Sequence, residues 1–153
     1  VYAAFGTKDE LYRASLQVFC DGLVDAITAC DVTSDNLETV LVELFEREID
    51  FYHQGDPPRG CFLVCTAPSE TANCEYVQEI LLSTVRRIDK SFEQLLKKAA
   101  KLGKIAKSTN VSATARALQA VIQSLAIRTR AGQSPRLLRR FARDSVRVVL
   151  SDA

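Results

Sequence analysis

The sequence predicts an all-α fold, a helical bundle of about six helices. Apolar residues recur at steps of three and four through most of the 153 residues, which is the period of an amphipathic helix. Helix-breaking residues are scarce: the chain has six Gly and four Pro, and the prolines fall at only three places, Pro57-Pro58, Pro68 and Pro135. An apolar fraction of 47% with 25% charged residues fits one globular domain with its own core.

The first helix is expected at about 8–29. Thr7 and Glu10 have the spacing of a capping box, in which the hydroxyl and the carboxylate accept hydrogen bonds from free backbone N–H groups at a helix start. The helix should end where Asp31-Val32-Thr33-Ser34 interrupts the pattern. We expect its apolar stripe to face the core, at Leu11, Leu16, Val18, Phe19, Leu23, Val24 and Ile27.

A second helix is expected at about 34–54, with Ser34 as its N-cap and the glycine and prolines of 55–58 as its stop. Its core-facing residues would be Leu37, Val40, Leu41, Leu44, Phe45, Ile49 and Tyr52. The apolar segment 60–65 has the propensity of a buried strand. No second strand exists to pair with it, so a short helix at about 60–66 is the better prediction.

The rest of the chain predicts three more helices. The longest would span about 70–102, opened by Ser69 or Thr71 and ended by Gly103. Asn110 is expected to cap the next helix, which carries a stripe of small residues. Ser134-Pro135 is an N-cap followed by proline at the first helical position, and it opens the last helix, whose core-facing residues would be Leu138, Phe141, Ala142, Val146 and Val149.

Charge divides the chain into two halves. Residues 1–76 carry 4 basic and 14 acidic side chains, whereas residues 77–153 carry 16 basic and 5 acidic ones. We expect the halves to fold against each other or to attract a charged partner, because repulsion within each half is otherwise uncompensated. No run of eighteen apolar residues and no signal-peptide core occur, so neither membrane contact nor export is expected and a cytoplasmic location is predicted.

The five cysteines are scattered without CxxC spacing and are expected to be mostly buried, reduced thiols. They are Cys20, Cys30, Cys61, Cys65 and Cys74, and we expect no metal site and no cofactor. An enzyme could use Cys61 or Cys65 with the single histidine, His53. No glycine-rich turn or acidic orienter accompanies these residues, so no catalytic residue is assigned.

Two segments of the sequence resemble the TetR/AcrR family of transcriptional regulators. The opening twelve residues, 1–12, resemble the "YxxFGSKExL" pattern that joins the recognition helix of that family to the next helix. Residues 59–64, Arg59-Gly60-Cys61-Phe62-Leu63-Val64, look like the "RGCFL" stretch of one large subgroup. Two departures stand out: Cys65 occupies a position where many relatives carry Asn, and the helix-turn-helix itself is absent.

The resemblance implies a division into a remnant of the DNA-binding headpiece at 1–6 and a ligand-binding and dimerisation domain at 7–153. The chain has no methionine, even at position 1, so we expect a fragment or a processed product from which most of the headpiece is missing. In the family, residues at the positions of Tyr2 and Lys8 approach DNA phosphates. Lys8 would lie in the first turn of a helix, where backbone N–H groups also favour an anion.

The resemblance further implies a regulator, most often a repressor, that binds a small hydrophobic or aromatic effector and forms a homodimer on operator DNA. The pocket would be lined by aromatic, soft or amphipathic side chains, for which we expect Phe19, Tyr52, Phe62, Cys65, Tyr76, Gln119, Ile122 and Gln123. The first helix would act as a lever between Lys8 and Phe19. The last two helices would form the dimer interface, for which we expect Ala113, Ala117, Ala120, Ser124, Leu138, Phe141, Ser145 and Val149.

Two alternatives remain open beside the enzyme. The basic run Lys97, Lys98, Lys101, Lys104 and Lys107 could bind nucleic acid or an acidic surface, although no aromatic residue is interleaved with it. A purely structural helical homodimer or interaction module, with no DNA-binding role, is the second.

Overall fold

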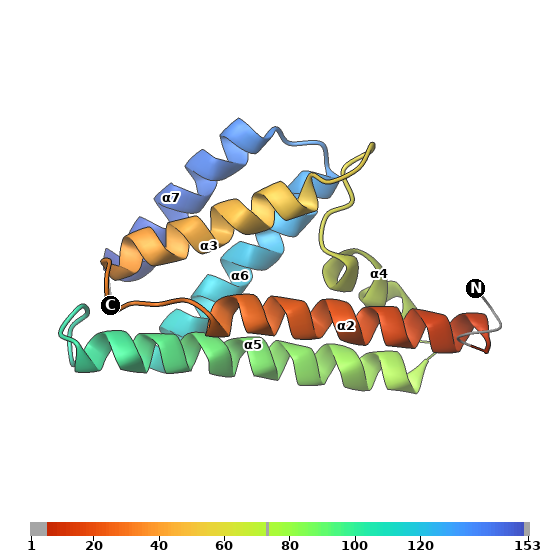
Figure 1. Ribbon diagram of the computed structural model, residues 1–153, viewed down its shortest axis with the longest axis horizontal. Coiled ribbons are helices and arrows are strands. Elements are labelled where there is room, and N and C mark those ends of the chain that lie inside the picture. The colour runs from red at the N-terminus through yellow and green to blue at the C-terminus, as the bar shows by residue number, and fades with distance from the viewer. Residues whose placement is uncertain (1–5, 73, 152–153) are drawn as a thin grey trace.

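The computed structural model describes residues 6–72 and 74–151, and within these ranges it contains six α-helices and no strand (Figure 1). The prediction of an all-α fold of about six helices is confirmed. The helices are α2 (Lys8–Thr28), α3 (Leu37–Tyr52), α4 (Phe62–Glu70), α5 (Glu75–Lys101), α6 (Val111–Arg130) and α7 (Pro135–Ser151).

The helices pack as two pairs with α6 between them (Figure 1). Helices α2 and α5 lie side by side and run in the same direction, as the ion pairs Asp21–Arg87 and Asp31–Lys98 show. Helices α3 and α7 lie side by side and run in opposite directions. Helix α6 packs against α5, α3 and α7, and the short α4 packs against α2, α5 and α6.

Helix starts follow the capping rules, with some corrections to the predicted residues. Thr7 and Glu10 form the predicted capping box, in which the Thr7 N–H donates to Glu10 Oε2 at 2.7 Å and the Glu10 N–H donates to Thr7 Oγ1 at 3.2 Å. Asn110 caps α6 as predicted. The predicted Ser34 cap is wrong, because Asn36 accepts from the Thr39 N–H at 2.8 Å and α3 begins at Leu37.

The boundary between α4 and α5 also differs from the prediction. Helix α4 begins at Phe62 and extends to Glu70, past the expected end at 66. Pro68 lies inside this helix, in its last turn. Proline has no backbone N–H, so one helical hydrogen bond is missing there. Helix α5 therefore begins at Glu75, and neither Ser69 nor Thr71 caps it.

One core is shared by all six helices, and it contains most of the residues predicted for it. Leu16, Phe45 and Phe92 are fully buried, and the rings of Phe45 and Phe92 meet edge to face with their centroids 6.4 Å apart. Val18 is a correction: it was expected in the core-facing stripe of the first helix but is 73% exposed.

The acidic and basic halves of the chain fold against each other. Five ion pairs join an acid before residue 77 to a base after it, including Arg143 Nη1 with Glu46 Oε1 at 2.6 Å and Arg147 Nε with Glu38 Oε1 at 2.8 Å. Arg139 pairs with Asp50 on the same side of α7. Three arginines spaced four apart on α7 thus meet three acids of α3, and the charge division of the sequence is compensated within the chain.

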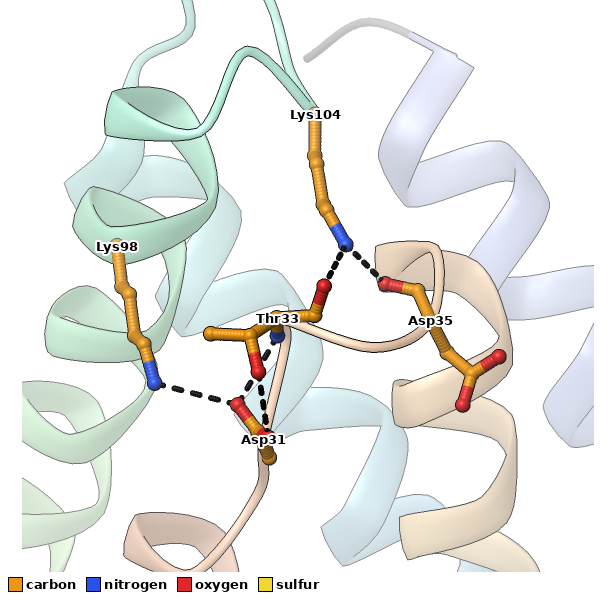
Figure 2. A network of polar contacts seen from close by, with 5 residues as sticks. All are labelled: Asp31, Thr33, Asp35, Lys98 and Lys104. Carbon is orange, nitrogen blue, oxygen red and sulfur yellow. Dashed lines mark hydrogen bonds and ion pairs between the residues drawn. The ribbon is translucent and has the colours of Figure 1, made fainter.

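A polar network fixes the connection between α2 and α3 (Figure 2). The Asp31 carboxylate accepts hydrogen bonds from the Thr33 backbone N–H at 2.9 Å and hydroxyl at 2.6 Å, and from Lys98 at 3.3 Å. Lys104 donates to the carbonyl oxygens of Thr33 and Asp35. The connection between α2 and α3 is therefore tied both to α5 and to the connection between α5 and α6.

No helix in the described ranges combines the length and the apolar character that crossing a membrane requires.

Candidate functional site

A pocket with a volume of about 640 Å³ opens between α2 and α3. Its wall is mostly one face of α2, on which the lining residues form adjacent pairs that repeat every four positions: Ala14, Ser15, Val18, Phe19, Gly22 and Leu23. Glu48 and Phe51 of α3 form the opposite side. Because Val18 is 73% and Phe51 45% exposed, the pocket is open to solvent. Its lining residues are mostly apolar.

A second pocket, of about 400 Å³, adjoins the first and shares Phe19 and Phe51 with it. Its other lining residues come from the connection between α3 and α4, from α4 and from α6: Gln54, Arg59, Gly60, Phe62, Cys65, Thr66 and Arg130. The ring centroid of Phe19 lies 5.8 Å from that of Phe51 and 6.0 Å from that of Phe62. An aromatic cluster therefore stands where the two pockets meet.

Helix α4 connects the pocket to the first turns of α2. The rings of Tyr12 and Phe62 meet edge to face at 5.5 Å, and the Tyr12 hydroxyl lies within hydrogen-bond distance of Thr66 Oγ1, at 3.0 Å. The Thr66 hydroxyl also donates to the Phe62 carbonyl oxygen at 2.7 Å. A shift of α4 would consequently be felt by α2 one and a half turns from its N-terminus.

The polar groups of the pockets differ between the two ends. At the α2–α3 end, burial raises the pKa of the half-buried Glu48 carboxyl above its usual range, the largest effect on that group. At the other end the polar lining residues are Arg59 and Arg130, with Gln54 and Thr66.

The residues predicted for the pocket divide into three groups. Phe19, Phe62 and Cys65 line the open pockets. Tyr52, Ile122 and Gln123 surround a separate space of only about 10 Å³ deeper in the bundle, where Tyr52 is 1% exposed.

The remaining two predicted residues lie in neither open pocket. Gln119 is buried, and its side-chain amide donates to the Val85 carbonyl oxygen at 3.3 Å, which ties α6 to α5. Tyr76 lies in the first turn of α5, where the Arg13 guanidinium stands 5.4 Å from its ring centroid.

Sequence reasoning missed most of the α2 wall and the Arg59–Arg130 end. One signal was present: Val18-Phe19 and Phe51-Tyr52 are adjacent apolar pairs, which make the apolar surface of each helix wider than a single core-facing stripe. One apolar residue of each pair faces away from the core: Val18 is 73% and Phe51 45% exposed, and both line the first pocket. No comparable pattern marked Arg59 and Arg130, which are 71 positions apart.

The arrangement does not support a cysteine nucleophile activated by histidine. His53 Nδ1 lies 2.8 Å from the Ile49 carbonyl oxygen, and Nε2 lies 3.2 Å from that of Gln133, so both ring nitrogens face the backbone. Burial raises the pKa of the Cys61 thiol to about 12, which disfavours the reactive thiolate. Within the described ranges, no three His, Cys, Asp or Glu side chains gather in a way that would hold a metal ion.

Lys8, predicted to contact a DNA phosphate, is exposed in the first turn of α2. Tyr2, the other residue predicted to contact DNA, lies outside the described residues. The basic run is largely engaged inside the chain: Lys97 pairs with Glu93, Lys98 with Asp31, and Lys104 with two backbone carbonyls.

The residues predicted for the dimer interface lie mainly on one surface of α6 and α7. Ala113 and Ala120 are exposed, and the rest of this face is half-buried, comprising Ala117, Ser124, Phe141, Ser145 and Val149. Exposed apolar side chains that were not predicted extend it, namely Ile127, Leu137 and Val148. Leu138 does not belong to this face: it is fully buried in the core of the chain, with no surface left for a partner.

Comparison with known proteins agrees with this architecture. A family model described as "Tetracyclin repressor-like, C-terminal domain" matches residues 39–144. The chain is 25% identical over 151 residues to the HTH-type transcriptional repressor ComR of Escherichia coli (strain K12), covering 97% of this chain and 71% of ComR.

Two solved structures of cysteine-substituted variants of the TetR family transcriptional regulator CifR, both complexed with 26-base-pair double-strand operator DNA, share the fold. Their TM-scores are 0.78 and 0.76, each at 20% identity over 95% of this chain and 76% of CifR. The family model covers more than half of the chain and includes the α3 side of the first pocket but not α2. The chain therefore belongs to the TetR family of transcriptional regulators, which are not enzymes, and it carries their C-terminal domain.

Proposed function

We propose that residues 7–153 form the effector-binding and dimerisation domain of a ligand-responsive transcriptional repressor, and that residues 1–6 end its DNA-binding headpiece. One observation carries the proposal: the wall of the apolar pocket is a face of α2, the same helix that presents Lys8 in its first turn. The name of ComR as a repressor and the operator DNA bound to CifR support the DNA-binding role.

The pocket suits a small, mostly apolar effector. Ligand pockets in proteins have volumes of about 300–1,000 Å³ and are lined mainly by apolar and aromatic side chains with a few polar groups. The two adjoining pockets, of about 640 and 400 Å³, fall in this range, and Phe19, Phe51 and Phe62 supply the aromatic surfaces.

Helix α2 would transmit the effect of the ligand. Eleven residues separate Phe19 from Lys8, which corresponds to roughly 16 Å along a helix. The connection that follows α2 is held by the network of Asp31, Lys98 and Lys104, so a displacement caused at Phe19 would be largest towards the N-terminal end of α2 (Figure 2). Lys8, and Tyr2 beyond it, would then contact operator phosphates only in one of two positions of α2.

The regulation is a shift between two states of a homodimer. The α6–α7 face, with its small residues at Ala113, Ala117 and Ala120, would pack against the same face of a second copy. In one state the two headpieces match successive major grooves, and in the other they do not. Release from the operator requires a coupling free energy of roughly 1–3 kcal/mol between ligand and DNA binding.

The test uses the full-length regulator and has two steps. Thermal unfolding is first measured across a panel of hydrophobic metabolites, drugs and quinones, since a ligand present at a hundred times its dissociation constant stabilises the folded state by about 2.7 kcal/mol. DNA fragments that the protein retains from its own genome are then mixed with each stabilising compound. We expect at least one compound to release a retained fragment.

Two outcomes would contradict the proposal. Retention of no genomic fragment above the level of random DNA would favour the alternative, a helical homodimer or interaction module without a DNA-binding role. Retention that no stabilising compound changes would remove the effector from the mechanism.

A further inference from the structure

Two arginines stand together at the α4 end of the pocket although they are far apart in sequence. Arg59 precedes α4 and Arg130 is the last residue of α6, and both line the second pocket. Gly60 brings them together: its N–H donates to the Tyr52 carbonyl oxygen at 3.0 Å, and a Cβ at this glycine would lie 3.6 Å from Cβ of Arg130.

The close approach at Gly60 is specific to glycine. Its φ is +67°, a conformation that other residues rarely adopt, and a Cβ there would lie 3.0 Å from Cys65 Sγ and 3.1 Å from the Ala126 carbonyl oxygen. The chain therefore accepts a restricted backbone at the position that places Arg59 beside α6.

Neither arginine has an acidic partner among the described residues. Arg87, Arg139, Arg143 and Arg147 each pair with a carboxylate of another helix, and the seven described ion pairs include neither Arg59 nor Arg130. Both are exposed, and neither forms an ion pair between helices in the described part of the chain. Two arginines that line one pocket without a carboxylate partner raise the local affinity for an anion.

The opposite end of the site has the opposite character. Glu48 lines the α2–α3 pocket among apolar residues, and its carboxylate would repel an anion placed there. Between the two ends lie the rings of Phe19, Phe51 and Phe62. The two ends of the site thus differ in charge. The α4 end is positive, the middle is aromatic, and the far end is an apolar groove with one acid.

We propose, on the basis of the proposed function, that the effector is an organic anion with an apolar or aromatic body, whose acidic group binds between Arg59 and Arg130. A planar guanidinium donates two parallel hydrogen bonds to a carboxylate, sulfonate or phosphate group. The body of the molecule lies on Phe19, Phe51 and Phe62 and extends into the groove along α2. Neutral molecules of the same shape bind in the same place but do not use the arginines.

The experiment compares two fluorescent probes that share an aromatic frame, anilinonaphthalene sulfonate and the neutral N-phenyl-naphthylamine. Both are titrated into the full-length regulator, into the single variants Arg59→Gln and Arg130→Gln, and into the double variant. Arg136→Gln is the matched control, because Arg136 is exposed on α7 and does not line the pockets. Circular dichroism and thermal unfolding check that each variant is folded.

We expect the double variant to bind the sulfonate about tenfold or more weakly, since charge-assisted hydrogen bonds are stronger than neutral ones. Its affinity for the neutral probe should stay within about twofold, and Arg136→Gln should change neither probe. Raising the salt concentration should weaken only the sulfonate in the unsubstituted protein, because salt screens exposed charges.

Two results would overturn the inference while leaving the proposed function intact. In the first, the sulfonate binds the double variant as tightly as the unsubstituted protein. In the second, both probes weaken equally, which would make the arginines structural. If neither probe binds the unsubstituted protein, the apolar pocket itself, and with it the effector part of the proposed function, is contradicted.

Discussion

The two sides of helix α3 differ in how completely they are packed against the rest of the chain. Towards the core and α7 it is packed: Phe45 and Ile49 are buried without exposed surface, and Glu38, Glu46 and Asp50 pair with three arginines of α7. Towards α2 it is open: Phe51 is 45% exposed, and Glu48 faces a groove of about 640 Å³. The first side already has its partners inside the chain, whereas the second offers aromatic surface to a molecule from outside.

The same contrast divides α2. One side packs along α5 and buries Leu16 and Cys20, while the other side presents Val18 and Gly22 to the pocket. Apolar surface that folding leaves uncovered on two facing helices is typical of a binding site. We conclude from this contrast that the packed sides determine stability and the open sides determine binding. Substitutions on the packed and the open side of the same helix test this.

The largest effect is expected from a pair of substitutions on α3. Phe45→Ala removes a fully buried ring that packs against Phe92, so it should lower the free energy of unfolding by about 3–5 kcal/mol. Phe51→Ala removes a ring from the open side and should cost less than about 1 kcal/mol while weakening N-phenyl-naphthylamine binding. Urea unfolding and probe titration measure both. Equal losses of stability would contradict the division of α3 into a packed and an open side.

Two glycines provide the next comparison. Gly60→Ala should destabilise the protein by about 1–3 kcal/mol, because alanine at φ +67° is strained and its Cβ meets the Ala126 carbonyl oxygen. Gly22→Ala, on the pocket face of α2 with no atom within 4 Å of the added Cβ, should stabilise it by about 0.5–1 kcal/mol. Thermal unfolding distinguishes them. A neutral Gly60→Ala would mean that this glycine does not set the position of Arg59.

The amount that could be predicted from the sequence depends on how local the responsible interaction is. The capping box of Thr7 and Glu10 involves residues three apart and was predicted correctly. The pairing of the two charged halves was also expected, because it follows from totals rather than from positions. Ser34 and Asn36 are both good N-caps, and only the fold decided between them in favour of Asn36.

The pocket was harder to predict because three segments distant in sequence meet there. Leu16 and Val18 both look like core residues of one helix, but whether the second is buried depends on where α3 stands. Phe19, Phe62 and Cys65, which were chosen for their chemistry, line the open pockets, whereas Gln119 lies in neither and its amide donates to a backbone carbonyl of α5. Arg59 and Arg130 meet only through the close approach at Gly60.

A third open surface, the α6–α7 face, is expected to be covered by a second copy of the chain. Ala120→Glu places a carboxylate on this face and, by the two-fold symmetry, near its own copy, so the dimer dissociation constant should rise about tenfold or more. Ala106→Glu, at an exposed position between α5 and α6, is the matched control. Sedimentation over a concentration series measures both. An unchanged dimer, or a monomer in the unsubstituted protein, would contradict this interface.

The smallest effect concerns the polar network at the C-terminal end of α2. Hydrogen bonds from the Thr33 hydroxyl and backbone, and then Lys98, lower the pKa of Asp31 from 3.8 to about 2. Because the folded state has the lower pKa, Asp31 stabilises the protein above about pH 4, and this contribution is lost as the pH falls towards 2. Asp31→Asn should therefore be less stable than the unsubstituted protein at pH 6, and the difference should shrink by pH 2. A difference independent of pH would contradict the role of the charge.

The most direct test of the pocket is to fill it. Gly22→Phe adds a ring to the α2 wall at a position with free space around the Cβ, and Gln78→Phe adds the same ring on the exposed surface of α5. N-phenyl-naphthylamine is titrated into the full-length regulator and both variants, whose thermal unfolding is measured in parallel. If the groove between α2, α3 and α4 is the effector site, Gly22→Phe reduces probe affinity more than about tenfold without loss of stability, and Gln78→Phe leaves it unchanged. Equal probe binding by all three proteins would place the ligand site elsewhere and contradict the account.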